Sequence, residues 1–250
     1  MRYILAFDSF KGAANSAELN AAAAQAIIDL QPDAEIIAID IADGGEGFAQ
    51  SFAASLHSGV KQIECPTVDP LGRPITATYF RHGNQAIMEL AAASGLPLLA
   101  ESERNPMIAS TSGTGLMMRH AISAGCGEIL LGIGGSATND AATGILAALG
   151  FEFLDNEGNV ITPNGENLAR IARIKNPDTK FPKIKIACDV SNPFCGPNGA
   201  AYLYAAQKGA SKSDIALLDK GLWQFAQVIN RRYNTDITNL PGAGAAGGVG

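Results

Sequence analysis

The sequence predicts an α/β protein that combines a parallel-sheet domain with a second, mixed-sheet domain. Apolar stretches at residues 3–7 and 36–41 flank a helical pattern, and the right-handed crossover of such a β-α-β unit makes its two strands parallel neighbours. Further along the chain, three short alternating segments separated by turns are typical of a β-meander. They lie at residues 60–65, 75–81 and 85–90.

These patterns divide the chain into segments of two domains. We expect residues 1–62 to form the first part of the parallel-sheet domain, residues 63–111 to begin the mixed-sheet domain, and residues 112–250 to be shared between the two. The chain ends inside a glycine-rich turn that lacks a partner. We therefore expect the natural protein to continue past Gly250, with the C-terminal part of the fold missing here.

The composition of the 250 residues indicates a compact globular protein. Hydrophobic residues make up 47% and charged residues 17%, which argues against disorder. The formal net charge of -6 argues against general binding to nucleic acid or to an anionic membrane. Four cysteines without a C-x-x-C pair, and the lack of a signal peptide or membrane-spanning stretch, favour a reduced, cytoplasmic protein.

The first predicted strand leads into Asp8 and Lys11, which are the first candidate site residues. The carboxyl ends of the strands of a parallel sheet form the edge at which ligands bind. An acid and a lysine at that edge can serve a proton transfer or bind a phosphate, and a solvated ion pair in a turn is an equal alternative. The helix that follows starts with a capping box of Asn15 and Glu18.

The second predicted strand ends in a glycine turn that carries two acids. Asp43 and Glu46 flank Gly44 and Gly45, at the same sheet edge as Asp8. The acids can hold a metal ion or orient a hydroxyl, and the alternative is a pair of acids at a helix start. The glycines crowded around the acids favour the functional interpretation.

Ser112, Gly113 and Thr114 lie in a loop of hydroxyls and glycines before a helix predicted at residues 116–124. The loop is a candidate anion site, with Arg104 as a charge partner. A well-capped helix start is the alternative, and the sequence alone does not decide between the two.

The most informative stretch is a glycine-rich turn between an apolar strand at residues 128–131 and a helix predicted from residue 141. Glycines let a phosphate approach the backbone closely, and the first N–H groups of a following helix point at the anion. Asp140 adds a carboxylate suited to a magnesium-bound water or a substrate hydroxyl. A turn that only packs is the alternative. The other candidate ligand-binding residues of the turn are Gly134, Gly135, Ser136, Thr138 and Asn139.

An apolar strand predicted at residues 184–190 carries Asp189 near its end, and this acid is the best single candidate for a general base. The alternative is an acid that caps the next turn. The chain has no G-x-x-x-x-G-K-[ST] motif, which excludes a P-loop. A G-x-G-x-x-G match at residues 242–247 follows no clear strand and precedes no helix, so the dinucleotide fingerprint lacks its context.

Six motifs in order give the chain a close resemblance to the bacterial glycerate kinases. They lie at residues 8–12, 42–47, 109–115, 132–140, 187–193 and 242–250. The resemblance covers the whole chain and implies a Rossmann-like or flavodoxin-like domain joined to a second α/β domain around a cleft. It also implies ATP- and Mg²⁺-dependent phosphorylation of D-glycerate to a phosphoglycerate, with 2-phosphoglycerate as the expected product.

Two departures from the family pattern bear on the structure. Members of the family run on past position 250 with a further glycine- and acid-containing motif. They also usually have glycine where this chain has Ala142. We expect the alanine to be tolerated, because the predicted helix has already begun at that point.

The resemblance gives each candidate residue an expected role. Backbone amides of residues 134–136 hold the ATP phosphates, helped by residues 112–114, and Asp189 or Asp8 accepts the proton of the glycerate hydroxyl. The other roles are neutralisation of the transferred charge by Lys11, Mg²⁺ binding through water by Asp43, Glu46 or Asp140, and binding of the glycerate carboxylate by Lys11, Arg73 or Arg104. Gly44 and Gly45 lie beside the substrate.

Two other functions are alternatives to the kinase. One is an NAD(P)-dependent oxidoreductase of a small hydroxy acid that uses the glycines at residues 242–247, and the other is a non-catalytic hydroxy-acid-binding module. As partners we expect a small-molecule substrate, D-glycerate, and neither nucleic acid nor a membrane, while a homodimer is left open.

Overall fold

The computed structural model describes residues 1–8, 10, 13–41, 44–45, 47–56 and 58–250. In these residues the chain forms a mixed α/β fold with a two-stranded parallel sheet, a five-stranded mixed sheet and a short antiparallel pair. Three of the predicted site residues, Lys11, Asp43 and Glu46, lie outside the described residues.

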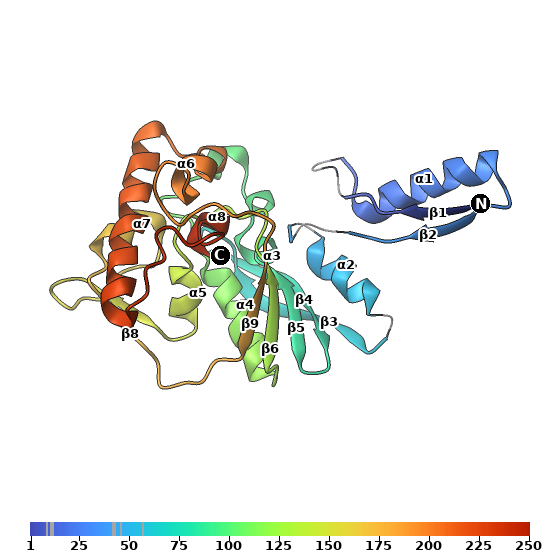
Figure 1. Cartoon of the computed structure of the whole chain (residues 1–250). Helices are drawn as coiled ribbons and strands as arrows, with labels where there is room; N and C mark the ends of the chain where they lie inside the picture. The colour runs from blue at the N-terminus through green and yellow to red at the C-terminus, as the bar shows by residue number, and fades with distance from the viewer. Residues whose placement is uncertain (9, 11–12, 42–43, 46, 57) are drawn as a thin grey trace.

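The N-terminal β-α-β unit is confirmed. It consists of β1 (Arg2–Leu5), α1 (Ser16–Leu30) and β2 (Glu35–Ala38), and the two strands pair in parallel. The predicted capping box of Asn15 and Glu18 opens α1. Strand β2 ends three residues before its predicted limit. In Figure 1 this unit projects from the rest of the molecule, with the carboxyl ends of its strands directed toward the larger sheet.

The five-stranded sheet contains the predicted β-meander. Its strands, in spatial order, are β3 (Val60–Val68), β4 (Pro74–His82), β5 (Gln85–Glu89), β6 (Glu128–Gly132) and β9 (Lys183–Ala187). The first three pair antiparallel, whereas β5, β6 and β9 pair in parallel. Strands from both sides of residue 111 therefore share one sheet, and the predicted division at residues 62 and 111 stays a prediction.

Two helices cover opposite faces of this sheet because neighbouring residues of a strand point to opposite sides. Ile87 packs with Phe48 and Ala49 of α2 (Phe48–Ser55) on one face. Met88 packs with Met117 of α4 (Ser112–Ser123) on the other face, in the larger core cluster.

A second core forms around the long helix α7 (Lys212–Tyr233), where Leu218, Leu222 and Phe225 are buried with Phe153. The remaining helices and strands are α3 (Ala91–Ser94), α5 (Thr143–Ala148), β7 (Glu152–Leu154), β8 (Arg173–Lys175), α6 (Ala200–Tyr204) and α8 (Ala245–Gly248). Four 3₁₀ helices connect them: η1 (Leu96–Leu98), η2 (Glu101–Glu103), η3 (Gly165–Arg170) and η4 (Ala206–Lys208).

Two predicted helix starts are wrong. Helix α4 begins at Ser112 and not at residue 116, so the hydroxyl-and-glycine loop is the first turn of the helix. Helix α5 begins at Thr143, because Ala141 and Ala142 have positive φ angles of 52° and 58°. The expected helical environment of Ala142 is therefore absent, and the alanine occupies a left-handed conformation that glycine adopts more readily.

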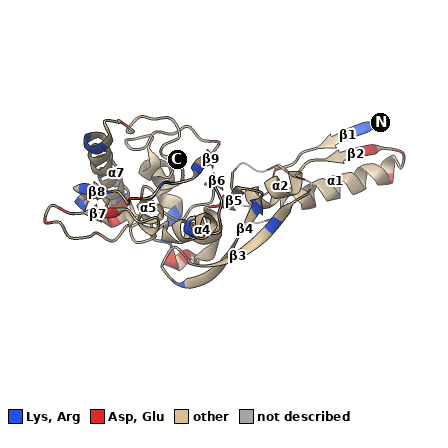
Figure 2. Ribbon diagram, turned by 90° about the horizontal axis from the view of Figure 1, so that it is seen from below, with Lys and Arg blue, Asp and Glu red and all other residues tan. Residues whose placement is uncertain are grey.

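Charged residues of both signs are spread along the ribbon of the described part of the chain (Figure 2). Among the helices that the structure describes, none is both long enough and apolar enough to cross a bilayer.

Candidate active site

The turns that follow β2 and β6 meet the end of β9 at the carboxyl edge of the five-stranded sheet. The Gly134 amide, after β6, donates to the Gly44 carbonyl, after β2, at 2.9 Å. A Cβ atom on Gly134 would lie 2.5 Å from the Gly45 Cα, and one on Gly44 would lie 2.7 Å from the carbonyl oxygen of Ala187 in β9. These glycines are needed because the backbones touch each other. These contacts bring residues 44, 134 and 187 together.

The same turn is held from the side that follows β5. The Leu96 amide donates to the Gly135 carbonyl and the Ala137 amide donates to the Ser94 carbonyl, both at 2.9 Å. Within the described part of the chain, the amides of Gly135 and Ser136 donate to no acceptor. Gly135 is exposed. In this geometry these two amides, and not that of Gly134, are available to an anion.

Asp140 is fully buried and joins two helix starts. Its Oδ2 atom accepts hydrogen bonds from the Thr111 amide (2.8 Å), the Thr111 hydroxyl (2.8 Å) and the Gly144 amide (3.2 Å). Burial raises the pKa of this carboxyl, and the hydrogen bonds from Thr111 and Gly144 oppose that change. The Asp140 carboxylate thus lies at the N-termini of both α4 and α5, where it interacts favourably with the positive ends of the two helix dipoles.

Polar atoms without partners are concentrated in the same turn. The Thr138 hydroxyl, both amide atoms of Asn139 and the Asp140 Oδ1 atom are buried and have no hydrogen-bond partner among the described residues. Buried polar groups are normally paired, and exceptions often mark sites for a ligand, an ion or a water molecule.

Ser112, Gly113 and Thr114 are engaged in packing. Gly113 accepts a hydrogen bond from Thr67 at 2.7 Å, and a Cβ atom on it would lie 2.0 Å from the Val68 carbonyl oxygen. The Thr114 hydroxyl lies 2.7 Å from that of Ser94. Gly113 and Thr114 are buried. This geometry supports the alternative interpretation of a well-fixed helix start for these two residues.

Lys208, at the end of η4, is a buried cation beneath the glycine-rich turn. Its Nζ atom donates to the Ser136 hydroxyl oxygen at 2.7 Å and to the Thr138 carbonyl at 2.6 Å, and only 2% of the residue is exposed. Burial lowers the pKa of the ammonium to about 7, and the charge of Asp140 acts in the opposite direction. The turn is therefore held by two buried ionisable side chains, those of Asp140 and Lys208.

Comparison with known proteins agrees with this arrangement. The sequence profile described as "Glycerate kinase family" matches residues 3–250. The chain belongs to this family. It is 37% identical to glycerate 2-kinase of Escherichia coli and 39% identical to glycerate kinase of Haemophilus influenzae, in each case over all of this chain and 67% of the relative. It therefore spans about two thirds of the length of these relatives.

A solved structure gives the same result. The chain matches a protein of Salmonella typhimurium LT2, named provisionally as glycerate kinase 2, with a TM-score of 0.86 and 37% identity. The match covers all of this chain and 68% of the other. The glycerate kinase fold is therefore shared over the whole described chain, and the chain is that of a kinase.

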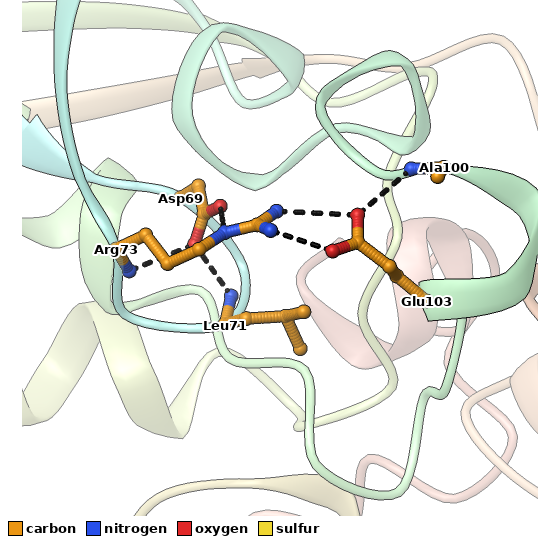
Figure 3. A network of polar contacts seen from close by, with 5 residues as sticks. All are labelled: Asp69, Leu71, Arg73, Ala100 and Glu103. Atoms are coloured by element: carbon orange, nitrogen blue, oxygen red, sulfur yellow. Dashed lines mark hydrogen bonds and ion pairs between the residues drawn. The ribbon is translucent and has the colours of Figure 1, made fainter.

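Arg73, a predicted substrate residue, is already bound by two carboxylates. Its guanidinium donates to Asp69 at 2.5 Å and to Glu103 at 2.6 Å (Figure 3). The hydrogen bonds with Glu103 and Asp69 raise the pKa of Arg73, and the hydrogen bond from Arg73 lowers the pKa of Glu103. These two ion pairs link the β3–β4 turn to η2. The guanidinium of Arg73 is therefore already engaged by carboxylates of the protein itself.

Arg104, the other predicted arginine, lies beside the segment that carries Lys208. Its backbone carbonyl touches the residue after Lys208, since a Cβ atom on Gly209 would lie 2.1 Å from this oxygen. Its Nε atom is buried and has no partner among the described residues. Of the two predicted arginines, Arg104 is thus the one with an unused buried donor.

The two candidate bases lie at strand ends, as predicted, and their roles stay predictions. Asp189 is exposed and follows β9, two residues after Ala187, which pairs with Gly132 of β6. Its charge contributes to raising the pKa of Tyr204, after the larger effect of burial. Asp8 is exposed and follows β1.

No group of three or more His, Cys, Asp or Glu side chains suited to a metal ion occurs among the residues described, which exclude Asp43 and Glu46. Asp140 offers one carboxylate oxygen, Oδ1, without a partner, and oxygen is the ligand that Mg²⁺ prefers.

Sequence reasoning missed Lys208. The only signal was a lysine between small residues, in the stretch Ala205-Ala206-Gln207-Lys208-Gly209-Ala210. Small neighbours allow close packing of the backbone, but no spacing rule connects position 208 with position 136. The glycines at residues 242–247 follow no strand, as predicted, but the short helix α8 begins among them at Ala245, which was not predicted. Gly247 packs against the Thr138 carbonyl.

Proposed function

We propose that this chain transfers a phosphoryl group from ATP to D-glycerate, with Mg²⁺ as the metal ion and 2-phosphoglycerate as the product. The main support is the meeting of the turns after β2 and β6 with the end of β9, in a chain of the glycerate kinase family. The name of the Escherichia coli relative, glycerate 2-kinase, supports phosphorylation at the 2-position.

The phosphate groups of ATP bind at Gly135, which is exposed, and at the buried Ser136 next to it. The amides of Gly135 and Ser136 provide two N–H donors, and Ser136 adds its hydroxyl. Phosphoryl transfer depends mainly on positioning and on the neutralisation of charge, so fixed backbone donors are suited to it. Ser112 lies at the start of α4 and is half-buried, which leaves it as a supporting donor.

Glycerate binds beside these phosphates, near the exposed acids at the strand ends. Asp189 accepts the proton of the attacking hydroxyl, with Asp8 as the second candidate. Arg104 pairs with the carboxylate of glycerate, because Arg73 is held by Asp69 and Glu103. Lys11, with Asp43, Gly44, Gly45 and Glu46 near the substrate, completes the proposed set.

Asp140 fits a metal role through its unpaired Oδ1 atom, and Asp43 and Glu46 provide further carboxylates in the sequence. When bound, Mg²⁺ neutralises phosphate charge. The buried position of Asp140 and the hydrogen bonds from Thr111 and Gly144 keep its side chain fixed, as a metal ligand requires.

At the level of the fold, we propose a Rossmann-like or flavodoxin-like domain and a second α/β domain around a cleft, whose closure excludes water from the reaction. A cytoplasmic location and a homodimer belong to the same proposal.

The test measures ADP formation from ATP and Mg²⁺ with and without D-glycerate, and identifies the product by ³¹P NMR. We expect glycerate-dependent ADP release and a 2-phosphoglycerate resonance. Asp189→Asn should lower kcat strongly, whereas the matched control Asp178→Asn, at another exposed acid, should not. ADP release that is independent of glycerate, or a response of NADH fluorescence in its place, would contradict the proposal.

A further inference from the structure

Lys208 is a charged side chain that the proposed reaction does not yet use. Its ammonium is buried, and it forms no salt bridge with any of the carboxylates that the structure describes. Burying a cation without a paired anion is unfavourable, which is why the pKa of this lysine falls to about 7. A bound anion near the ammonium would provide the missing negative charge.

The hydrogen bonds of Lys208 determine how Ser136 can act. An ammonium group only donates hydrogen bonds, so the Ser136 hydroxyl oxygen is the acceptor at 2.7 Å. The hydrogen of that hydroxyl is then free to be donated, and it has no acceptor among the described residues. A hydroxyl that accepts a hydrogen bond from a cation is also a stronger donor, because the two bonds polarise each other.

The second contact fixes the backbone of the turn. Lys208 donates to the Thr138 carbonyl at 2.6 Å, two residues after Ser136. The Thr138 hydroxyl and both amide atoms of Asn139 are fully buried and unpaired within the described residues. These unpaired polar atoms are a separate indication that a polar ligand belongs at this turn and that packing alone is not its purpose.

We propose that Lys208 is a positioning residue of the phosphate-binding turn: it directs the Ser136 hydroxyl as a donor toward the phosphate oxygens of a nucleoside triphosphate at Gly135 and Ser136. This inference rests on the proposed function. Lys208 acts through Ser136 and does not itself touch the ligand, since it lies beneath a turn of which only Gly135 is exposed and Gly134 half-buried.

A double-mutant cycle tests this in the full chain, with Mg-ATP binding measured by calorimetry and steady-state kinetics for ATP and D-glycerate. Lys208→Met removes the charge and keeps the length of the side chain, and Ser136→Ala removes the hydroxyl. A lost hydrogen bond to a charged ligand corresponds to about a 10- to 100-fold effect, so each single variant should raise the Kd and KM for ATP by roughly that factor. The KM for glycerate should change much less.

The double variant decides the matter. If Lys208 acts through Ser136, Lys208→Met should have almost no additional effect on ATP affinity in the Ser136→Ala background. Effects of the two substitutions that multiply would overturn the inference. Lys212→Met, at an exposed lysine four residues along the chain, is the matched control and should bind ATP like the wild type.

A purely structural role gives a different result. It would lower the melting temperature and the active fraction, and so kcat, without changing the KM for ATP. If Lys208→Met does not fold, Ser136→Ala alone still tests the inference, because wild-type ATP affinity in that variant would refute it. A wild-type chain that neither binds Mg-ATP nor phosphorylates glycerate would refute the proposed function itself, which is a distinguishable outcome.

Discussion

Replacing Ala142 by glycine should stabilise the fold, although glycine in a helix interior is destabilising. Ala142 has a φ angle of 58° immediately before α5. An L-residue in this conformation is less stable by roughly 1–2 kcal/mol, whereas glycine is not. Glycine has more freedom in the unfolded chain, which offsets about 0.4–1 kcal/mol. The half-buried methyl group adds a small further loss. We expect a net gain of about 0.5 kcal/mol for Ala142→Gly.

Ala147→Gly is the matched control, because Ala147 is a half-buried alanine inside the same helix. There, glycine should lower the free energy of unfolding by about 0.5–1 kcal/mol. Urea unfolding followed by circular dichroism measures both variants, and the opposite signs are the critical result. If both substitutions destabilise the fold equally, Ala142 is not strained and the helix begins earlier than the structure shows.

Three further predictions concern the charged residues. Asp140→Ala should lower the free energy of unfolding by about 3 kcal/mol or more, because it leaves three buried donors unpaired. Asp140→Asn should lower it much less, since a carbonyl can take the place of Oδ2, and equal losses in urea unfolding would refute this. Arg104→Met should raise the KM for D-glycerate at least tenfold, whereas Arg73→Met should not. If initial-rate kinetics show the large increase in KM for Arg73→Met instead, Arg73 is the arginine that binds the substrate carboxylate. The pKa of Lys208 falls on folding from 10.5 to about 7. Between these two pH values the unfolded chain binds a proton at Lys208 that the folded chain does not. Stability should decrease as the pH falls from about 10.5 toward 7, by at most about 1.4 kcal/mol per pH unit. The free energy of unfolding of the wild type minus that of Lys208→Met should therefore be larger at pH 10 than at pH 7, and parallel pH profiles of the two proteins would contradict this.

The features predicted correctly are those that local sequence determines. Alternation of apolar residues was sufficient for the meander of β3, β4 and β5, and the spacing of Asn15 and Glu18 was sufficient for the capping box. Such patterns act through neighbours in the same strand or helix turn, so they can be seen in a short window of sequence.

The start of α5 was predicted wrongly because a distant segment determines it. The Ala141 amide donates to the Gly247 carbonyl at 3.0 Å, and Gly247 packs against the Thr138 carbonyl. The chain at residues 141 and 142 must turn through the left-handed region to meet that segment. More than a hundred residues separate the partners, so neither helix propensity nor capping rules contain the information.

The glycine-rich turns were predicted at the right positions, but the reason given for their glycines was incomplete. The sequence suggested that they let a phosphate approach the backbone, whereas Gly44 and Gly134 let two backbones approach each other. That contact brings three strand ends together before any ligand is present. It also uses the Gly134 amide, so the proposed donors shift by one residue to Gly135 and Ser136.

The buried charges explain how such a turn can keep one shape. Asp140 attaches one end of it to the starts of α4 and α5, and Lys208 attaches Ser136 and Thr138 to η4. A turn held from both ends loses little entropy when it binds an anion, and its donors need no reorganisation during phosphoryl transfer. Loosening either end should therefore weaken ATP binding even where no atom that touches ATP has changed. On this reasoning Asp140→Ala, which removes the anchor of the far end, should raise the Kd for Mg-free ATP as well as for Mg-ATP. A loss confined to Mg-ATP would instead assign Asp140 to the metal ion.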